Sequence, residues 1–330
     1  MLEGSVRKGG NRVRITGQLI DTSTGAHIWA DRFDGALDDI FDLQDLVASN
    51  VAGAIEPKHR QSEIERATRK PTESLDAWDL YLRALALRYQ YTEESIREAI
   101  VMLRRALAID PSFAPAAAMI GSCRMHQRAH RLAPVADAEI TEAVRLAKGA
   151  IDAGKDDPDA LWMAGWTLSF LGGEPAMGAN VIDRALTLNP NSAHAWMARG
   201  LVSIYQNRPD RAIEAVERAI RRSPLDPWGA RAFTSLMGLA HFAAGRYEQA
   251  IVWADRSLAA QPDYRTGLLL KVISSAQLGR VDEACDALSR VLELEPGLTI
   301  ARWKAPAPPF PPELLARYED GLRKAGLPEE

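Results

Sequence analysis

The chain has 330 residues, 47% of them apolar and 25% charged, and its 40 Lys and Arg against 44 Asp and Glu give a net charge of −4. This length allows about two domains of roughly 150 residues, and the balanced charge argues against a nucleic-acid surface. Two cysteines cannot build a disulfide framework. No apolar run approaches the roughly 18 residues of a membrane span, and no signal peptide is evident. We therefore expect a cytoplasmic protein that uses no membrane segment.

Residues 1–56 carry the pattern of a small α+β unit. Apolar and polar side chains alternate over residues 12–19, which predicts a strand with one buried face. Gly9-Gly10-Asn11 separates it from an earlier strand, and such residues favour a tight hairpin turn. A second turn over residues 21–25 leads to a third strand, and apolar residues from position 40 onward recur at helical spacing. The order is β-β-β-α, too short for a complete domain.

Residues 57–72 are charged and bracketed by prolines, so we expect a partly helical linker. A nucleic-acid patch is the less favoured reading, because acidic residues dilute its charge and no aromatic residues are interleaved.

Residues 73–303 repeat with a period near 34 residues. Pro190, Pro224, Pro262 and Pro296 are separated by 34, 38 and 34 positions. A small residue precedes each proline by 12 positions: Gly178, Ala212, Ala250 and Ala284. Small residues let paired helices cross closely, and a proline ends the second helix of a pair. This is the tetratricopeptide pattern, and it predicts about six repeats in a mostly α, right-handed solenoid.

Residues 304–330 are expected to close the solenoid. The proline-rich residues 304–312 cannot be helical, and an apolar stripe of Leu314, Leu315, Tyr318 and Leu322 predicts a capping helix after them. The spacing from Pro308 to Pro311 would also suit a polyproline-reading domain, although a stiff strap between repeat and cap is the favoured reading.

A search for catalytic and metal-binding patterns finds little. Nucleotide-binding glycine loops and the nucleophile elbow are absent, and Ser5 with Lys8 fits a serine–lysine spacing only by chance. Cys123, His126 and His130 share one face of a predicted helix and could ligate zinc or copper. Nearby arginines would repel a cation and no fourth ligand is evident, so we predict no metal, no cofactor and no catalytic residue.

Binding is the favoured activity, because a stack of such repeats presents its first helices as a concave wall. The repeat register predicts an apolar partner-binding groove lined by Trp162, Trp166, Phe170, Met197, Leu201, Tyr205, Leu239 and Phe242. Leu269 and Ile273 extend the same wall. Each of these residues could instead pack between repeats. A clamp for a C-terminal carboxylate is disfavoured, because the Lys and Asn residues it uses are absent at these offsets.

Both ends of the chain resemble a known family of bacterial regulators. The segments 2–7, 12–21, 24–33 and 39–45 resemble the end of a TolB-like amino-terminal domain, which in such regulators precedes tetratricopeptide repeats. Residues 320–329 resemble the ending of class III adenylate/guanylate cyclases that carry C-terminal repeats. The resemblance implies that residues 1–56 are the later part of a TolB-like domain. It also implies that the catalytic domain lies outside this sequence, so no catalytic residue is carried over.

Three hypotheses follow. The first is a non-catalytic interaction module that binds a peptide, a partner protein or an upstream or sister cyclase domain. The second is the regulatory C-terminal portion of a nucleotide cyclase, and the third, disfavoured by the charge, is a fragment of a DNA-binding activator. An exposed edge of the small sheet could also pair two copies into an oligomer.

Overall fold

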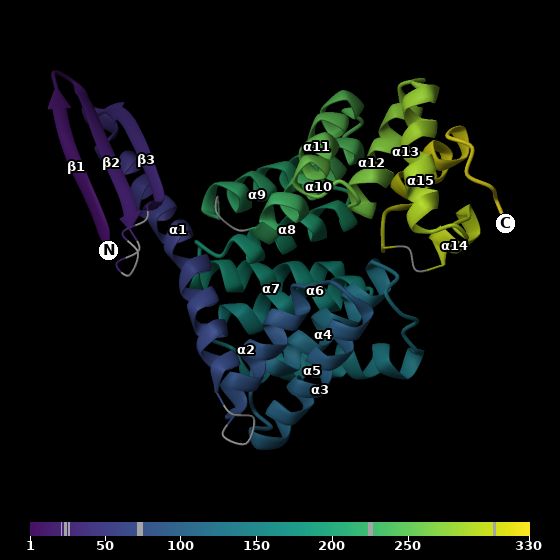
Figure 1. Cartoon of the computed structure of the whole chain (residues 1–330), viewed down its shortest axis with the longest axis horizontal. Helices are drawn as coiled ribbons and strands as arrows, with labels where there is room; N and C mark the ends of the chain where they lie inside the picture. Colours follow the sequence, from purple (N-terminus) through teal and green to yellow (C-terminus); the bar gives the residue numbers. More distant parts are fainter. Residues whose placement is uncertain (21, 23–24, 26, 71–74, 224–226, 306–307) are drawn as a thin grey trace.

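The architecture of the chain is seen in a computed structural model that describes residues 1–20, 22, 25, 27–70, 75–223, 227–305 and 308–330 (Figure 1). Three parts follow one another: a small sheet, a long helix, and a curved stack of helices that ends in a short cap. Most of the turn expected over residues 21–25, together with Pro71, Pro224 and two positions of the proline-rich strap, lies outside the described residues.

The sheet has three antiparallel strands in the order β1 (Leu2–Gly9), β2 (Arg12–Ile20) and β3 (His27–Ala36). Gly10 makes the first hairpin possible, because its φ of 62° lies in the left-handed region that glycine adopts without strain. The alternation of side chains buries one face of β2 and β3 and leaves all of β1 exposed. A 3₁₀ turn, η1 (Leu37–Asp39), follows.

The helix α1 (Ile40–Arg69) runs for 30 residues and joins the sheet to the stack. Its first half supplies Leu43 to the buried face of the sheet. Its last turns bring Ile64 and Ala67 into the core of the helical stack, where α1 packs against α2 and also reaches α9. The segment 57–69 of the expected linker is therefore the second half of this helix.

Six helix pairs follow in the described part of the chain, each pair antiparallel and packed on the next (Figure 1). The pairs are α2 (Ala77–Arg88) with α3 (Glu93–Ile109), α4 (Ala114–Ala129) with α5 (Asp137–Ala153), α6 (Pro158–Phe170) with α7 (Pro175–Leu188), α8 (Ala193–Tyr205) with α9 (Pro209–Arg222), α10 (Pro227–Ala243) with α11 (Tyr247–Ala260), and α12 (Arg265–Gln277) with α13 (Val281–Leu294). The first helices of the pairs form one wall of the stack. The prediction of a mostly helical solenoid preceded by a small α+β segment is confirmed.

Local chemistry fixes the ends of these helices. Asp76 and Thr92 close capping boxes at the starts of α2 and α3, which satisfies backbone N–H groups that have no partner within a helix. Each turn inside a pair contains one residue in the left-handed region: Tyr91, Arg131, Gly173, Asn207, Gly245 and Gly279. A left-handed residue is therefore common to the six turns, although the turn between α4 and α5 is longer than the others.

Small residues set the close crossing of the helices within a pair. A Cβ atom added at Gly165 would lie 2.7 Å from the carbonyl oxygen of Gly178 on the facing helix. Ala212, Ala250 and Ala284, which hold the equivalent place in later pairs, are fully buried. The period of small residues in the sequence is therefore the period of these crossings.

The C-terminal end folds back over the stack. Two helices, α14 (Ile300–Lys304) and α15 (Pro312–Lys324), form the cap, and α15 packs on α12 with Leu314, Tyr318 and Leu322 buried. The turn after α4 reaches the same region, because Arg131 donates from Nη1 to the Arg302 carbonyl oxygen at 2.6 Å. The curvature of the stack thus brings its second pair against its cap.

Candidate functional site

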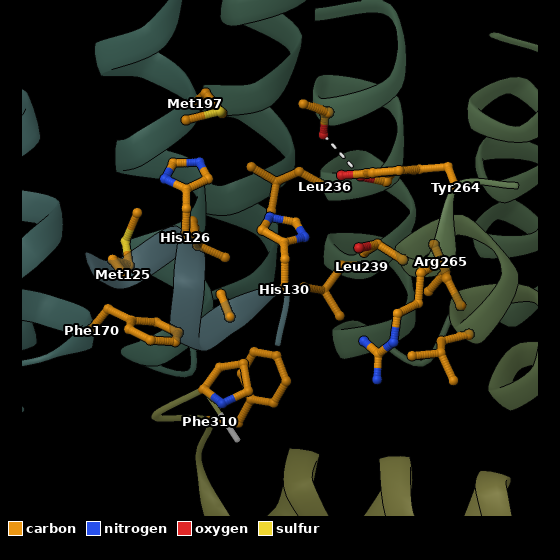
Figure 2. Close-up of a pocket in the computed structure, with 18 of the residues that line it drawn as sticks. Met125, His126, His130, Phe170, Met197, Leu236, Leu239, Tyr264, Arg265 and Phe310 are labelled. Atoms are coloured by element: carbon orange, nitrogen blue, oxygen red, sulfur yellow. Dashed lines mark hydrogen bonds between the residues drawn. The ribbon is translucent and has the colours of Figure 1, made fainter. Parts of the chain in front are cut away.

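The concave wall of the stack encloses a cavity of about 180 Å³. Its lining comes from the first helices of five successive pairs (α4, α6, α8, α10 and α12) and from the C-terminal cap. Figure 2 shows these side chains converging, with His126 and His130 facing Arg265 across the cavity and Phe310 at one side. A cavity of this size matches one that holds a single aromatic ring.

The residues predicted for the groove separate into two groups. Six of the eight line the cavity: Trp166, Phe170, Met197, Leu201, Tyr205 and Leu239. Leu269 lines it as well, whereas Ile273 is fully buried elsewhere. Leu201 and Leu239 are the partly exposed members of this group, and the other four are buried.

Trp162 and Phe242 do not line the cavity. Trp162 is 2% exposed, and its indole N–H donates to Asp159 at 2.9 Å. Phe242 is fully buried against the rings of Tyr247 and Tyr318. Trp162 packs between repeats, against Arg88 and His194, which is the alternative that the register left open. Phe242 packs between its own helix pair and the C-terminal cap.

The cap supplies four lining residues that the repeat register does not reach: Trp303, Pro308, Phe310 and Tyr318. The rings of Trp303 and Tyr318 stack with centroids 4.3 Å apart, and Phe310 lies 6.1 Å from Tyr205. Burial raises the pKa of the Tyr318 hydroxyl to about 12, so this group stays neutral. The proline-rich strap therefore places an aromatic side chain at the cavity.

Two of the three residues considered as metal ligands, His126 and His130, line this cavity, whereas Cys123 does not. His126 Nδ1 donates to the Ser122 carbonyl oxygen at 2.7 Å, so His126 Nε2 is left to accept from the Tyr91 hydroxyl at 3.0 Å. Cys123 is fully buried, which raises the pKa of its thiol to about 11. Among the described residues, no three His, Cys, Asp or Glu side chains converge in a way that could hold a metal ion.

The two histidines of the cavity are held in the neutral form. Burial and then the charge of Arg88 lower the pKa of His126 well below its ordinary value of 6.5. Burial, followed by the charges of Arg265 and Arg231, lowers the pKa of His130 to about 4. At neutral pH both imidazoles therefore present uncharged rings to the cavity.

Comparison with known proteins agrees with this architecture. Residues 172–227 and 229–299 match the family model for the tetratricopeptide repeat. The chain contains tetratricopeptide repeats. The repeat period that the prolines and small residues predict is thereby confirmed, while the assignment of residues 1–56 to a TolB-like domain stays a prediction.

One curated relative is "Putative adenylate cyclase 3" of Rhizobium meliloti (strain 1021), which is 35% identical over 171 residues. The match covers 52% of this chain and only 29% of the relative. The chain therefore spans less than a third of the length of this relative.

Solved structures are similar to this chain at low identity. PilW, a type IV pilus biogenesis factor, superposes with a TM-score of 0.50 and 17% identity over 67% of this chain and 94% of its own. PilF of Pseudomonas aeruginosa gives a TM-score of 0.46 at 19% identity, covering 73% of this chain and 95% of its own. At 17% identity, the likeness to PilW supports the helical-repeat fold and nothing further. In the described ranges, no helix is both long and apolar enough to cross a membrane.

Proposed function

We propose that this chain is a non-catalytic interaction module whose tetratricopeptide stack binds an apolar segment of a partner protein at the concave cavity. The main observation in support of this proposal is the cavity, to which five successive repeats contribute apolar and aromatic side chains. Buried aromatic pockets of this kind hold the anchor residues of protein interfaces.

The volume limits what the cavity accepts. About 180 Å³ is enough for one large apolar side chain and too small for most drug-sized ligands. Leu201 on α8 and Leu239 on α10 are partly exposed at the cavity, so an incoming side chain would contact both. The proposed partner therefore inserts one bulky apolar anchor from an otherwise exposed segment.

Selection from a displayed random-peptide library would test this mode. We expect selected peptides to share one bulky apolar residue, and Leu201→Gln and Leu239→Gln to weaken their binding about tenfold each. Val252→Gln is the matched control, because Val252 is 51% exposed on α11 and does not line the cavity. Equal losses for all three variants, or selected peptides without an apolar anchor, would contradict the proposal. Thermal melting of each variant separates lost binding from lost folding.

The second part of the proposal is that this module regulates a nucleotide cyclase. The observation in its favour is the 35% identity to the relative named an adenylate cyclase. Its test compares cyclic AMP formed by that relative with cyclic AMP formed by the same protein lacking the matching 171-residue segment. We expect altered output from the shortened protein, and equal output would reject the regulatory role.

The non-catalytic assignment has its own test. The purified chain incubated with ATP or GTP and Mn²⁺ is expected to form no cyclic nucleotide, and measurable turnover would overturn it.

A further inference from the structure

The cavity is apolar in its lining but lies in a strongly cationic part of the molecule. Among its described lining residues there is no Asp or Glu, and Arg265 is the one permanently charged side chain. Three more arginines, Arg88, Arg131 and Arg231, stand directly behind lining residues or beside Arg265. The whole chain carries a net charge of −4, so this concentration of positive charge is local.

Arg265 is only partly neutralised. Its Nε lies 2.9 Å from Oε2 of Glu295, while its Nη2 is buried and has no hydrogen-bond acceptor. Glu295 is shared, because its other oxygen lies 3.1 Å from Nε of Arg131. One carboxylate thus serves two guanidinium groups, and a buried donor of Arg265 stays unsatisfied at the edge of the cavity.

Two further arginines have no carboxylate partner in the described part of the chain. Arg231 lies over the ring of Tyr91, with 5.0 Å from its guanidinium carbon to the ring centroid. Arg88 is 1% exposed and lies 5.9 Å from the centroid of Trp162, and its Nε and Nη2 have no acceptor. Since a buried charge without a partner is costly, this region favours a group that supplies negative charge.

Two backbone turns next to the cavity adopt a strained conformation. Tyr91 and Arg131 have φ of 57° and 56°, although bulky residues rarely adopt this region and glycine fills it in three of the other turns. Tyr91 lines the cavity, and Arg131 holds the glutamate that Arg265 shares. Side chains replace glycine in three of the six turns, at Tyr91, Arg131 and Asn207, and the side chains of the first two serve this site.

We propose that the segment bound at the cavity is acidic, with an Asp or Glu beside its apolar anchor whose carboxylate pairs with Arg265. This inference rests on the proposed function, since it specifies the chemistry of the same partner. Arg265 Nη2 supplies the hydrogen bond, and Arg231 and Arg88 supply a favourable field. The strap at residues 304–312 brings Phe310 to the cavity but has no acidic residue, so a partner would add the charge that the chain's own segment lacks.

The test uses two acetylated and amidated peptides that differ only in charge. Each carries one tryptophan among glycine and serine residues, flanked by glutamates in one peptide and by glutamines in the other. We expect the glutamate peptide to bind at least about tenfold more tightly, as a charge-assisted hydrogen bond allows. We also expect added salt to reduce this difference. Blocked termini exclude recognition of a C-terminal carboxylate.

Arg265→Met should abolish the preference for glutamate, so that this variant binds the glutamate and glutamine peptides with equal affinity. Arg131 still pairs with Glu295 in this variant, so the glutamate is not left alone. Arg221→Met is the control, because Arg221 is 55% exposed on α9, away from the cavity lining. Arg231→Met provides a second variant if the first melts early.

The outcomes separate this inference from the proposed function. If both peptides bind equally, the acidic preference is wrong and the apolar groove stands. If neither binds, the proposed groove itself fails. If Arg221→Met loses the preference as fully as Arg265→Met, the attraction comes from general surface charge and the assignment to Arg265 is overturned.

Discussion

The solenoid and the small sheet of this chain bury their apolar side chains in different ways. In the solenoid, one continuous apolar cluster extends from Ile64 on α1 to Leu327 after the last helix. The described core of the sheet has five buried residues: Val13, Leu19, Trp29, Phe33 and Leu43. A stack shares its stability among neighbouring repeats, whereas the sheet depends on one helix covering one face.

The uncovered strand β1 shows the consequence. Leu2 and Val6 pair with Leu19 and Ile15, so they lie on the same face of the sheet as the buried residues. They nevertheless remain 50% and 70% exposed, because α1 packs against β2 and β3. The comparison therefore predicts a stable, cooperative solenoid and a sheet that opens locally at lower free energy.

Removing a buried tryptophan from the solenoid should have the largest effect. Trp162→Ala deletes a side chain that is 2% exposed and leaves Asp159 without its indole donor. We expect a loss of about 4 kcal/mol in the free energy of unfolding, in the range of Trp→Ala changes in packed cores. Denaturant unfolding followed by circular dichroism at the helical band measures it. A loss below about 1 kcal/mol would show that the repeats do not share stability through this contact.

The same substitution in the sheet should have a more local effect. Trp29 is 8% exposed and packs against Phe33, with ring centroids 6.3 Å apart. Trp29→Ala should open the sheet, because its core is small, at a local cost of up to about 3 kcal/mol. Hydrogen exchange should then lose protection over residues 12–36 while the helices of the solenoid keep theirs. Equal loss of protection in both regions would mean that they unfold as one unit.

The contrast between the two regions also explains what the sequence could and could not predict. The helix pairs follow from the spacing of Pro190, Gly178 and their equivalents, because each repeat uses the same crossing. The register likewise places Trp166, Met197 and Leu239 on the wall of the cavity. These features repeat locally, so a period in the sequence is enough to find them.

The other parts of the site are brought together by the curvature of the stack. Phe310 and Tyr318 reach the cavity because the cap folds back, and Arg131 meets Glu295 although 164 positions separate them in the sequence. The repeat register predicts Trp162 as a groove residue, but its side chain contacts Asp159 and Arg88 and does not line the cavity. No periodic signal records these long-range contacts, and the left-handed turns at Tyr91 and Arg131 lack the glycine that would have marked them.

Lowering the pH should change the stability of the two regions differently, and by less than the tryptophan substitutions do. Burial lowers the pKa of His130 from 6.5 to about 4, so between these values the unfolded chain binds more protons than the folded one. The free energy of unfolding of the solenoid therefore falls as pH falls below about 6.5, by roughly 1 kcal/mol per pH unit for each such histidine. His126, whose pKa is also lowered, acts in the same direction.

The sheet should respond only in stronger acid. Its ion pair joins Arg14 Nε to Asp34 Oδ1 at 2.6 Å and holds the pKa of Asp34 below its ordinary value of 3.8. The contribution of this carboxylate is fully present well above that value and is lost as pH falls through the lowered pKa, so it is nearly unchanged between pH 6.5 and about 5. Hydrogen exchange at several pH values should show helix protection declining in that window while the protection of the strands stays constant. His130→Gln should flatten the decline, and an unchanged slope in this variant would place the acid sensitivity at other groups.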